Sequence, residues 1–468
     1  MKKSRYGTLV TITALVAACG GPPDSARRAQ RLLNAGEYEQ AEKLADQELS
    51  RFPKQPLLWR VKIQAAIGRR DAGRAVNIYN EWKQLRGDHD RTAIKAMALS
   101  TLWQGLYTPS AKVKLAAIQA AERLDLAPLA DSVSERLEDD DPAVSAAAAV
   151  AILRWHPDAP EVATRSLQSD DPRARAIAVE GIARKVGDYA RADLIPLFRD
   201  PDARVRRALV SAIWKFATAD DVDKIKAIAS GDDDGSVRAA ALRALANKDF
   251  AGALELGRAA LRDDFLGARL AGLALLDRRG GKPANDELTG VAAGDDLFLA
   301  LRAAVALNRR GHQGRTLPIA TRAATSDSWS VRAAAMNAIA QVATKDEALP
   351  LIRTALLDEH VSVRLAAARA LVRFKEIEDA RTALVAALQS ESDSAKVQAA
   401  IDLVRIEDKR GRAALDELAQ AASPDTRQQA VRALLQVGDA TDGLVRAMAD
   451  ESPEVRIIAA EVALTLFD

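Results

Sequence analysis

The chain has 468 residues, of which 67 are Lys or Arg and 65 are Asp or Glu, so its charges nearly balance. This balance argues against binding to nucleic acid through bulk electrostatic attraction. Cys19 is the single cysteine, which excludes disulfide bonds within the chain and sites built from several thiolates. Only 4% of the residues are aromatic. Alanine is abundant, which suits close packing between helices.

The first residues have the pattern of a signal segment. A basic stretch, residues 2–5, precedes an apolar stretch, residues 7–18, that is too short to span a bilayer as a helix. The residues before Cys19 resemble the lipobox of bacterial lipoproteins. The resemblance implies that residues 1–18 are removed and that Cys19 is lipidated. It also implies a periplasm-facing anchor in the bacterial cell envelope, with Gly20 indicating the outer membrane. The alternative is an ordinary secretory signal with an incidental cysteine.

Residues 19–24 form a short Gly- and Pro-containing linker, and residues 25–99 form a segment of their own. This segment resembles tetratricopeptide repeats in its turn glycine, its two packing positions and its terminating proline, which are Gly36, Tyr38, Ala41 and Pro53. It departs from that pattern at Ala45 and Arg70. We expect helical units that cap a longer array.

Residues 100–468 repeat one phrase: an acidic turn, then a basic residue, then small apolar residues at helical spacing. Neighbouring basic positions lie 29 to 33 residues apart, except for a gap of 61 residues in which Ser145 occupies the middle position. A fixed period of this length predicts twelve stacked units in one array. The basic positions are Lys114, Arg175, Arg206, Arg238, Arg269, Arg302, Arg332, Arg364, Lys396, Arg427 and Arg456.

These repeats resemble the short HEAT class, including the variety named for phycobilin lyases. The resemblance implies an all-α, right-handed α-solenoid of helix pairs. It also implies that each ladder arginine pairs with turn acids of adjacent repeats. Acidic clusters such as residues 139–141 and 232–234 then serve this ladder and cap helices. The alternative for these clusters is a site for a hard cation.

The turns before several ladder positions carry rings in place of acids. Phe265, Phe298 and Trp329, with Val361, are candidates for an apolar stripe along one edge of the middle repeats. Exposed aromatic groups mark interaction sites, so this stripe is a candidate partner-binding surface. The alternative is that each ring packs beneath its own loop.

Two consecutive loops in the same region are basic and rich in glycine. A patch for an acidic partner, lipid phosphate or glycan is one interpretation; favourable placement of cations at helix C-termini is the other. The candidate residues are Arg278, Arg279, Lys282, Arg309, Arg310 and Arg315. A third ambiguity concerns the last repeat, whose apolar Ile457, Ile458 and Phe467 either pack internally or form an end-on docking face.

No catalytic motif stands out in the sequence. The four histidines are scattered without ligand spacing, so we expect no metal site, no cofactor and no small-molecule substrate. The favoured hypothesis is a non-enzymatic scaffold, anchored to the membrane by its lipid, that binds another envelope protein. The alternative is an accessory subunit or lyase-like enzyme. Nucleic-acid binding is disfavoured by the signal segment and the balanced charge.

Overall fold

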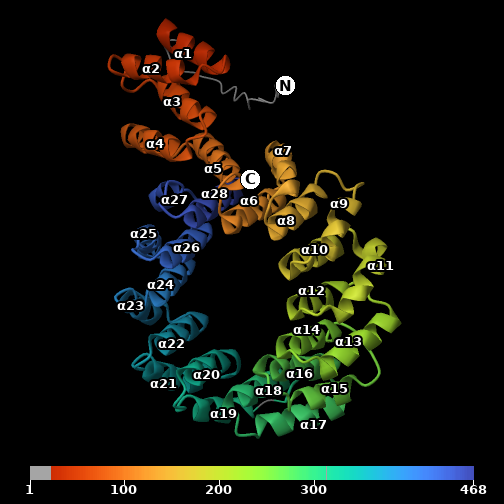
Figure 1. The fold of residues 1–468 in the computed structure, drawn as a ribbon. Helices are drawn as coiled ribbons and strands as arrows, with labels where there is room; N and C mark the ends of the chain where they lie inside the picture. The colour runs from red at the N-terminus through yellow and green to blue at the C-terminus, as the bar shows by residue number, and fades with distance from the viewer. Residues whose placement is uncertain (1–22, 313, 468) are drawn as a thin grey trace. The chain divides into compact units, whose positions relative to one another are not determined.

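The computed structural model describes residues 23–312 and 314–467, so the predicted signal segment and Cys19 lie outside the described residues. All regular elements within these ranges are helices, and most are arranged as consecutive pairs (Figure 1). The predicted all-α solenoid class is confirmed. The described chain separates into two compact units, one formed by the residues up to 108 together with those from 419 onward, and the other by residues 109–418.

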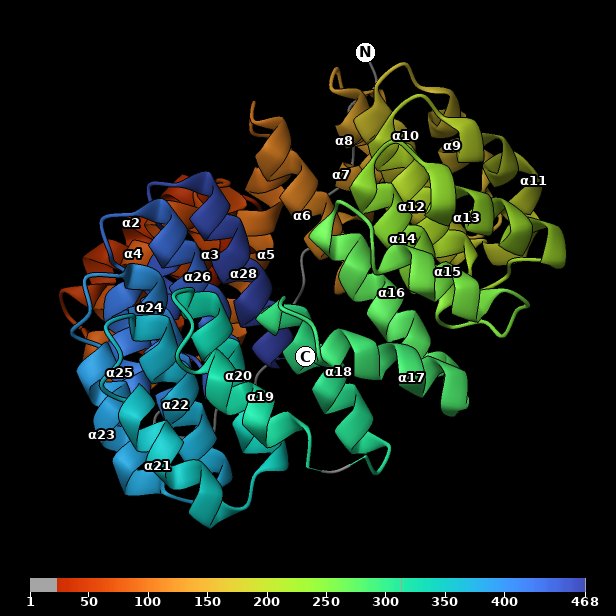
Figure 2. The ribbon, with the colours of Figure 1, turned by 90° about the horizontal axis from the view of Figure 1, so that it is seen from below.

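The central unit, residues 109–418, is a stack of helix pairs. The second helices of the pairs carry the repeated phrase and pack side by side, as α10, α12, α14 and α16 do in Figure 2. They are α6 (Ala111–Arg123), α8 (Pro142–Ile152), α10 (Pro172–Lys185), α12 (Ala203–Ile213), α14 (Gly235–Leu245), α16 (Leu266–Arg279), α18 (Leu297–Arg309), α20 (Trp329–Val342), α22 (Val361–Arg373) and α24 (Asp393–Arg405).

The first helices of the pairs are more variable, and three of them join short 3-10 segments. They are η1 (Ala127–Leu129), α7 (Ala130–Ser134) and η2 (Glu135–Glu138); α9 (Glu161–Thr164) and η3 (Arg165–Gln168); η4 (Gly187–Ala190), α11 (Arg191–Leu194) and η5 (Ile195–Arg199); then α13 (Ala219–Gly231), α15 (Ala253–Ala260), α17 (Gly281–Ala292), α19 (Thr316–Ala323), α21 (Lys345–Ala355), α23 (Ile377–Ala387) and α25 (Lys409–Leu418).

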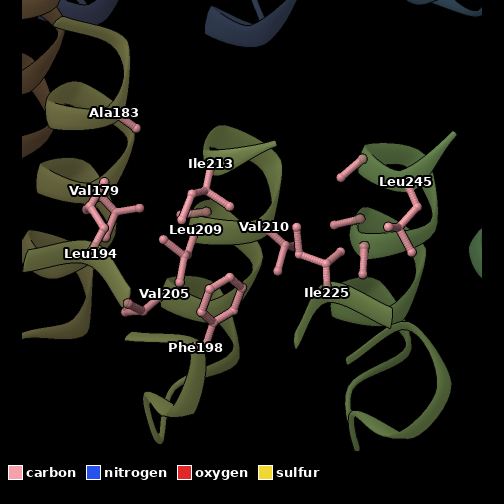
Figure 3. Packing of buried hydrophobic residues seen from close by; sticks show 14 of the residues in the cluster. Val179, Ala183, Leu194, Phe198, Val205, Leu209, Val210, Ile213, Ile225 and Leu245 are labelled. Carbon is pink, nitrogen blue, oxygen red and sulfur yellow. The ribbon is translucent and has the colours of Figure 1, made fainter. Parts of the chain in front are cut away.

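The core of this unit consists of apolar clusters that each span several helices of consecutive repeats. Between α10 and α14, apolar side chains from both helices of each pair interdigitate, among them Val179, Leu194, Phe198, Leu209 and Ile225 (Figure 3). Alanines occupy many of the remaining buried positions. Each repeat therefore buries its apolar face against its neighbours, which is how arrays of this kind gain stability.

The other unit combines both ends of the described chain. Its N-terminal helices are α1 (Asp24–Asn34), α2 (Tyr38–Leu49), α3 (Pro56–Gly68), α4 (Ala72–Arg86) and α5 (Arg91–Leu106). Its C-terminal elements are α26 (Pro424–Ala433), η6 (Leu434–Val437), α27 (Asp442–Ala447) and α28 (Pro453–Phe467). The predicted domain boundaries at residues 24 and 99 stay predictions, and the packing boundaries fall at residues 108 and 418.

Helix α28 packs against α5 as well as α26 (Figure 1). Ile457 and Ile458 are buried, 2% and 5% exposed. The Lys95 ammonium donates to the Phe467 carbonyl oxygen at 2.8 Å, and Lys83 pairs with Asp442 at 2.8 Å. The apolar last repeat is thus covered by helices of the same chain, which removes the end-on docking face considered above.

Because α5 and α28 share one core, removal of α28 should loosen α5. A variant that stops after Ser452 is expected to lose hydrogen-exchange protection in residues 91–106 while residues 203–213 and 235–245 keep theirs. Hydrogen exchange with mass spectrometry measures this directly. Unchanged protection of residues 91–106 would show that the two chain ends do not depend on each other.

Candidate functional site

The repeated arginine joins neighbouring repeats through a two-sided contact. Arg238 donates from Nε and Nη2 to the Asp263 carboxylate of the next turn, both at 2.7 Å, and from Nη1 to the carbonyl oxygens of Asp232 and Asp233 in its own turn, at 2.8 and 3.3 Å. We call this complete arrangement a closed rung. Closed rungs also form at Arg175, Arg206, Arg332 and Arg427.

The acid of each rung also organises its own turn. Asp263 accepts a hydrogen bond from the Phe265 backbone N–H at 2.8 Å, and Asp232 accepts one from Asp234 at 3.0 Å. Asp234 in turn caps α14 by accepting from the Ser236 and Val237 backbone N–H groups. The acidic clusters are therefore engaged in rungs and caps. No cluster of three or more metal-ligating side chains occurs among residues 23–312 and 314–467.

Some ladder arginines make only half of this contact, and we call these open rungs. Arg269 and Arg364 donate from Nη1 to their own turn carbonyls, at 2.9 and 2.7 Å for the shorter bonds. Within the described ranges, neither guanidinium reaches a carboxylate of the next turn. At Arg364 the reason is chemical, because Ser390 occupies the position of the rung acid. Arg456, in the last repeat, makes the same half contact.

Arg302 does not occupy the ladder position that the spacing predicted. Helix α18 is capped by Asp296, so Arg302 lies six residues after the cap, whereas Arg238 lies four residues after Asp234. The position that corresponds to Arg238 is Ala300, which is fully buried. Arg302 is exposed, and its guanidinium lies 5.4 Å from the centroid of the Phe298 ring. The regular spacing of basic residues concealed this shift.

The predicted stripe residues divide into exposed and covered groups. Phe265 and Trp329 are 42% and 46% exposed, whereas Phe298 is partly covered by Arg302. Phe265 lies over Gly235 and Gly267, where a side chain would collide with the ring. Trp329 stacks on His360, with ring centroids 4.2 Å apart. These two rings therefore pack locally, Phe265 on two glycines and Trp329 on His360, and remain nearly half exposed.

Val361 does not belong to this exposed surface. It packs against the apolar cluster of Leu365, Leu384 and Leu403, because its place at the start of α22 directs it toward the repeat that follows. His360 takes the neighbouring position and contacts Trp329 instead. The exposed candidates are thus Phe265 and Trp329, to which the structure adds Leu266 at 42% exposed.

The basic candidates are only partly available for a ligand. Arg309 and Arg310 both pair with Asp277, at 2.6 and 3.3 Å, and Lys282 pairs with Asp286 at 2.8 Å. The remaining three, Arg278, Arg279 and Arg315, are exposed. Internal ion pairs therefore account for half of the proposed patch.

A second series of bridges joins the first helices and was not predicted. Arg191 pairs with the fully buried Asp221 at 2.7 Å, and Arg258 pairs with Glu287 at 2.7 Å. Hydrogen bonds from Arg191 and Thr218 hold the pKa of Asp221 at about 2 despite its burial. The recurrence of acids about one repeat after these arginines is a signal that a search at the same period could have found.

A cavity of about 410 Å³ opens beside Trp82 in the unit that contains both chain ends. Its lining residues are Lys54, Pro56, Arg60, Trp82, Leu85 and Arg86. Arg60 and Arg86 both pair with the buried Asp90, at 3.4 and 2.9 Å. These lining residues include no hydroxyl, thiol or imidazole group that could act as a nucleophile or general base.

The rung at Asp263 predicts a specific dependence of stability on pH. The hydrogen bonds from Arg238 hold the pKa of Asp263 at about 2, below its ordinary 3.8. A carboxylate with a lowered pKa stabilises the fold above about pH 4, and this contribution is lost as the pH falls toward about 2. Asp263→Asn should therefore lower the free energy of unfolding by about 1–2 kcal/mol at pH 7, with the deficit shrinking toward pH 2.

Urea unfolding followed by circular dichroism at pH 7, 4 and 2 measures this difference. The control is Asp249→Asn, which changes an exposed aspartate outside the rungs. It should change the free energy of unfolding only slightly at pH 7. A deficit for Asp263→Asn that stays constant between pH 7 and 2 would contradict an ionic rung.

Comparison with known proteins gives the family. A model of HEAT repeats matches residues 159–246, 316–405 and 382–465. No curated protein sequence matches. No helix in the described part of the chain is both long and apolar enough to cross a membrane.

The solved structures that match this chain include three proteins. YibA of Escherichia coli is 20% identical with a TM-score of 0.35, covering 55% of this chain and 95% of that one. A chain of the Kap95:Nup1 complex is 14% identical with a TM-score of 0.38, covering 90% and 59%. Human deoxyhypusine hydroxylase is 16% identical with a TM-score of 0.23, covering 61% and 98%. The HEAT-repeat matches span half of the chain, and the chain belongs to the HEAT-repeat family.

Proposed function

We propose that the protein is a scaffold, anchored to the membrane of a bacterial cell envelope, that binds another envelope protein along the turns that begin α16 to α22. The observation that carries this proposal is the Phe265 ring at a helix cap. In α8, α10, α12 and α14 that position is an aspartate whose carboxylate accepts from the helix N-terminus. At α16 the cap is Phe265, and no side chain caps the helix.

Phe265 in place of a capping aspartate is expected to make the start of α16 less stable. Loss of a capping side chain costs about 1 kcal/mol, and an exposed ring recovers only part of its apolar transfer energy. Trp329 presents a second large ring on a nearby turn of the same unit, and it too is nearly half exposed. Aromatic side chains that remain exposed at a rigid edge are typical of protein-binding hot spots. A stacked array supplies such an edge without any reactive group.

The anchoring part of the proposal rests on the lipobox-like residues that end at Cys19. Acylation of this cysteine, with more than one chain, gives stable attachment to a membrane without a spanning helix. The balanced charge and the absence of a catalytic pair from the cavity at Trp82 favour a binding role over the lyase-like alternative.

The docking surface can be tested by photo-crosslinking in the native envelope. Benzoylphenylalanine placed at Phe265 or Trp329 should give one defined crosslinked protein, which mass spectrometry identifies. The matched control is Tyr189, an aromatic residue of the same unit that is 91% exposed and lies away from the ring-bearing turns. A crosslink of equal strength at Tyr189, or none at Phe265 and Trp329, would refute this docking surface.

The anchor can be tested independently of the partner. Cys19→Ser should move the protein from the membrane fraction to the soluble periplasmic fraction and abolish incorporation of labelled palmitate. A Gly21→Ser variant, which leaves the cysteine intact, should behave as the unmodified chain does. Membrane association and labelling that persist in Cys19→Ser would contradict lipid anchoring at this residue.

A further inference from the structure

The open rungs at Arg269 and Arg364 leave one side of each guanidinium unused. In a closed rung, Nη1 binds the arginine's own turn while Nε and Nη2 form a fork around a carboxylate. At Arg364, Nη1 donates to the Asp358 and Glu359 carbonyl oxygens at 2.7 and 2.8 Å. The guanidinium is thus oriented as in a closed rung. Among the residues described, no hydrogen bond joins its Nε–Nη2 fork to an acceptor.

The closed rungs define which group fits the fork. At Arg332 the fork binds Asp358 at 2.7 and 2.9 Å, and at Arg206 it binds Asp232 at 2.8 Å with both nitrogens. Paired N–H donors in this planar arrangement match the two oxygens of a carboxylate and form strong, charge-assisted hydrogen bonds. A carboxylate supplied from outside the chain would find the same geometry at an open rung.

Both open rungs lie beside the exposed rings. Arg269 comes four residues after Phe265, and Arg364 comes four residues after His360, on which Trp329 stacks. The helices that carry the two open rungs, α16 and α22, also pack less closely on the next second helix. α16 contacts α18, and α22 contacts α24, much less extensively than α14 contacts α16 or α20 contacts α22. An exposed ring and an open rung therefore share the turn before α16, and the open rung of Arg364 lies on the turn whose His360 contacts the second exposed ring, Trp329.

We propose that this surface binds an acidic, aromatic- or aliphatic-containing segment of a partner protein, whose Asp or Glu carboxylates complete the open rungs at Arg364 and Arg269. This inference rests on the proposed scaffold function and specifies the chemistry of the partner. The forks match carboxylates, as the closed rungs show, and the faces of Phe265 and Trp329 hold the apolar side chains between them. A membrane surface is the alternative that the vesicle experiment below tests, because a guanidinium fork also matches phosphate.

The decisive variant closes a rung from within the chain. Ser390 already accepts a hydrogen bond from the Ser392 N–H at 3.1 Å, as Asp358 does from His360 at 2.8 Å, so an aspartate fits this turn. Ser390→Asp should place a carboxylate in the Arg364 fork. The melting temperature should rise, while a partner carboxylate loses its site. A change that stabilises the fold and weakens binding would distinguish two roles of Arg364, stabilising the repeat junction and binding a partner carboxylate.

The probe is a fluorescein-labelled 12-residue peptide of alternating Glu and Leu, compared by fluorescence anisotropy with the same peptide containing Gln in place of Glu. The Glu peptide should bind the full chain. The Gln peptide should bind at least about tenfold more weakly, because its amide side chains cannot form charge-assisted hydrogen bonds with the forks. Ser390→Asp and Arg269→Gln should each weaken binding of the Glu peptide by about tenfold or more.

The matched control is Arg278→Gln combined with Arg279→Gln. Both of these arginines are exposed in the last turn of α16 and lie outside the rungs, so the double variant removes positive charge without altering a fork. It should leave peptide binding unchanged. Equal binding of the Glu and Gln peptides, no effect of Ser390→Asp, or loss of binding only in the Arg278 and Arg279 variant would each overturn the proposal.

Two further outcomes separate this inference from the scaffold proposal. If vesicles containing 30% phosphatidylglycerol bind the chain in a manner that Ser390→Asp abolishes, while the Glu peptide does not bind, the forks recognise lipid phosphate and the proposal of a protein partner segment fails. If the crosslinks from Phe265 and Trp329 persist undiminished in Ser390→Asp with Arg269→Gln, the docking surface stands, but carboxylates do not complete its rungs.

Discussion

The rung between an arginine and an aspartate of the next turn is the contact on which the regularity of this array depends. One guanidinium satisfies two carbonyl oxygens of its own turn and one carboxylate of the next, and that carboxylate also receives a backbone N–H. The position of each repeat is therefore specified by polar groups at the edge as well as by apolar packing inside. Because both partners are only slightly exposed, their alignment depends on the surrounding helices remaining in place.

Such contacts are local, so their loss affects one junction. In an array where each repeat touches only its neighbours, an open rung leaves distant repeats intact. This tolerance explains how Ser390 can replace an acid, and how Ala300 can replace an arginine, within an otherwise continuous stack. It also explains why rings can occupy turns near these junctions. A position released from capping or ion pairing becomes available for another use, and exposed aromatic faces are suited to binding.

The fold could be predicted from the sequence, whereas the positions of several candidate site residues could not. The period of the repeated phrase indicated stacked helix pairs, because helix length and turn length recur together. It misplaced Arg302, since register depends on which residue caps α18 and Asp296 caps it earlier than the spacing implied. Val361 was assigned to the surface because a turn residue and a first helical residue are adjacent in sequence, yet they face different neighbours.

The packing of α28 on α5 could not be predicted from the repeat period, because it joins residues more than three hundred positions apart. An array normally needs a polar outer face on its last repeat, since that repeat has no neighbour to cover it. Here Ile457 and Ile458 can be apolar because the N-terminal helices complete the same core. The terminal apolar face that an open array would offer to a partner is already used within the chain. The docking surface that we propose therefore lies on the turns along the array, where the forks of Arg269 and Arg364 bind no carboxylate of the described chain and the rings of Phe265 and Trp329 stay partly exposed.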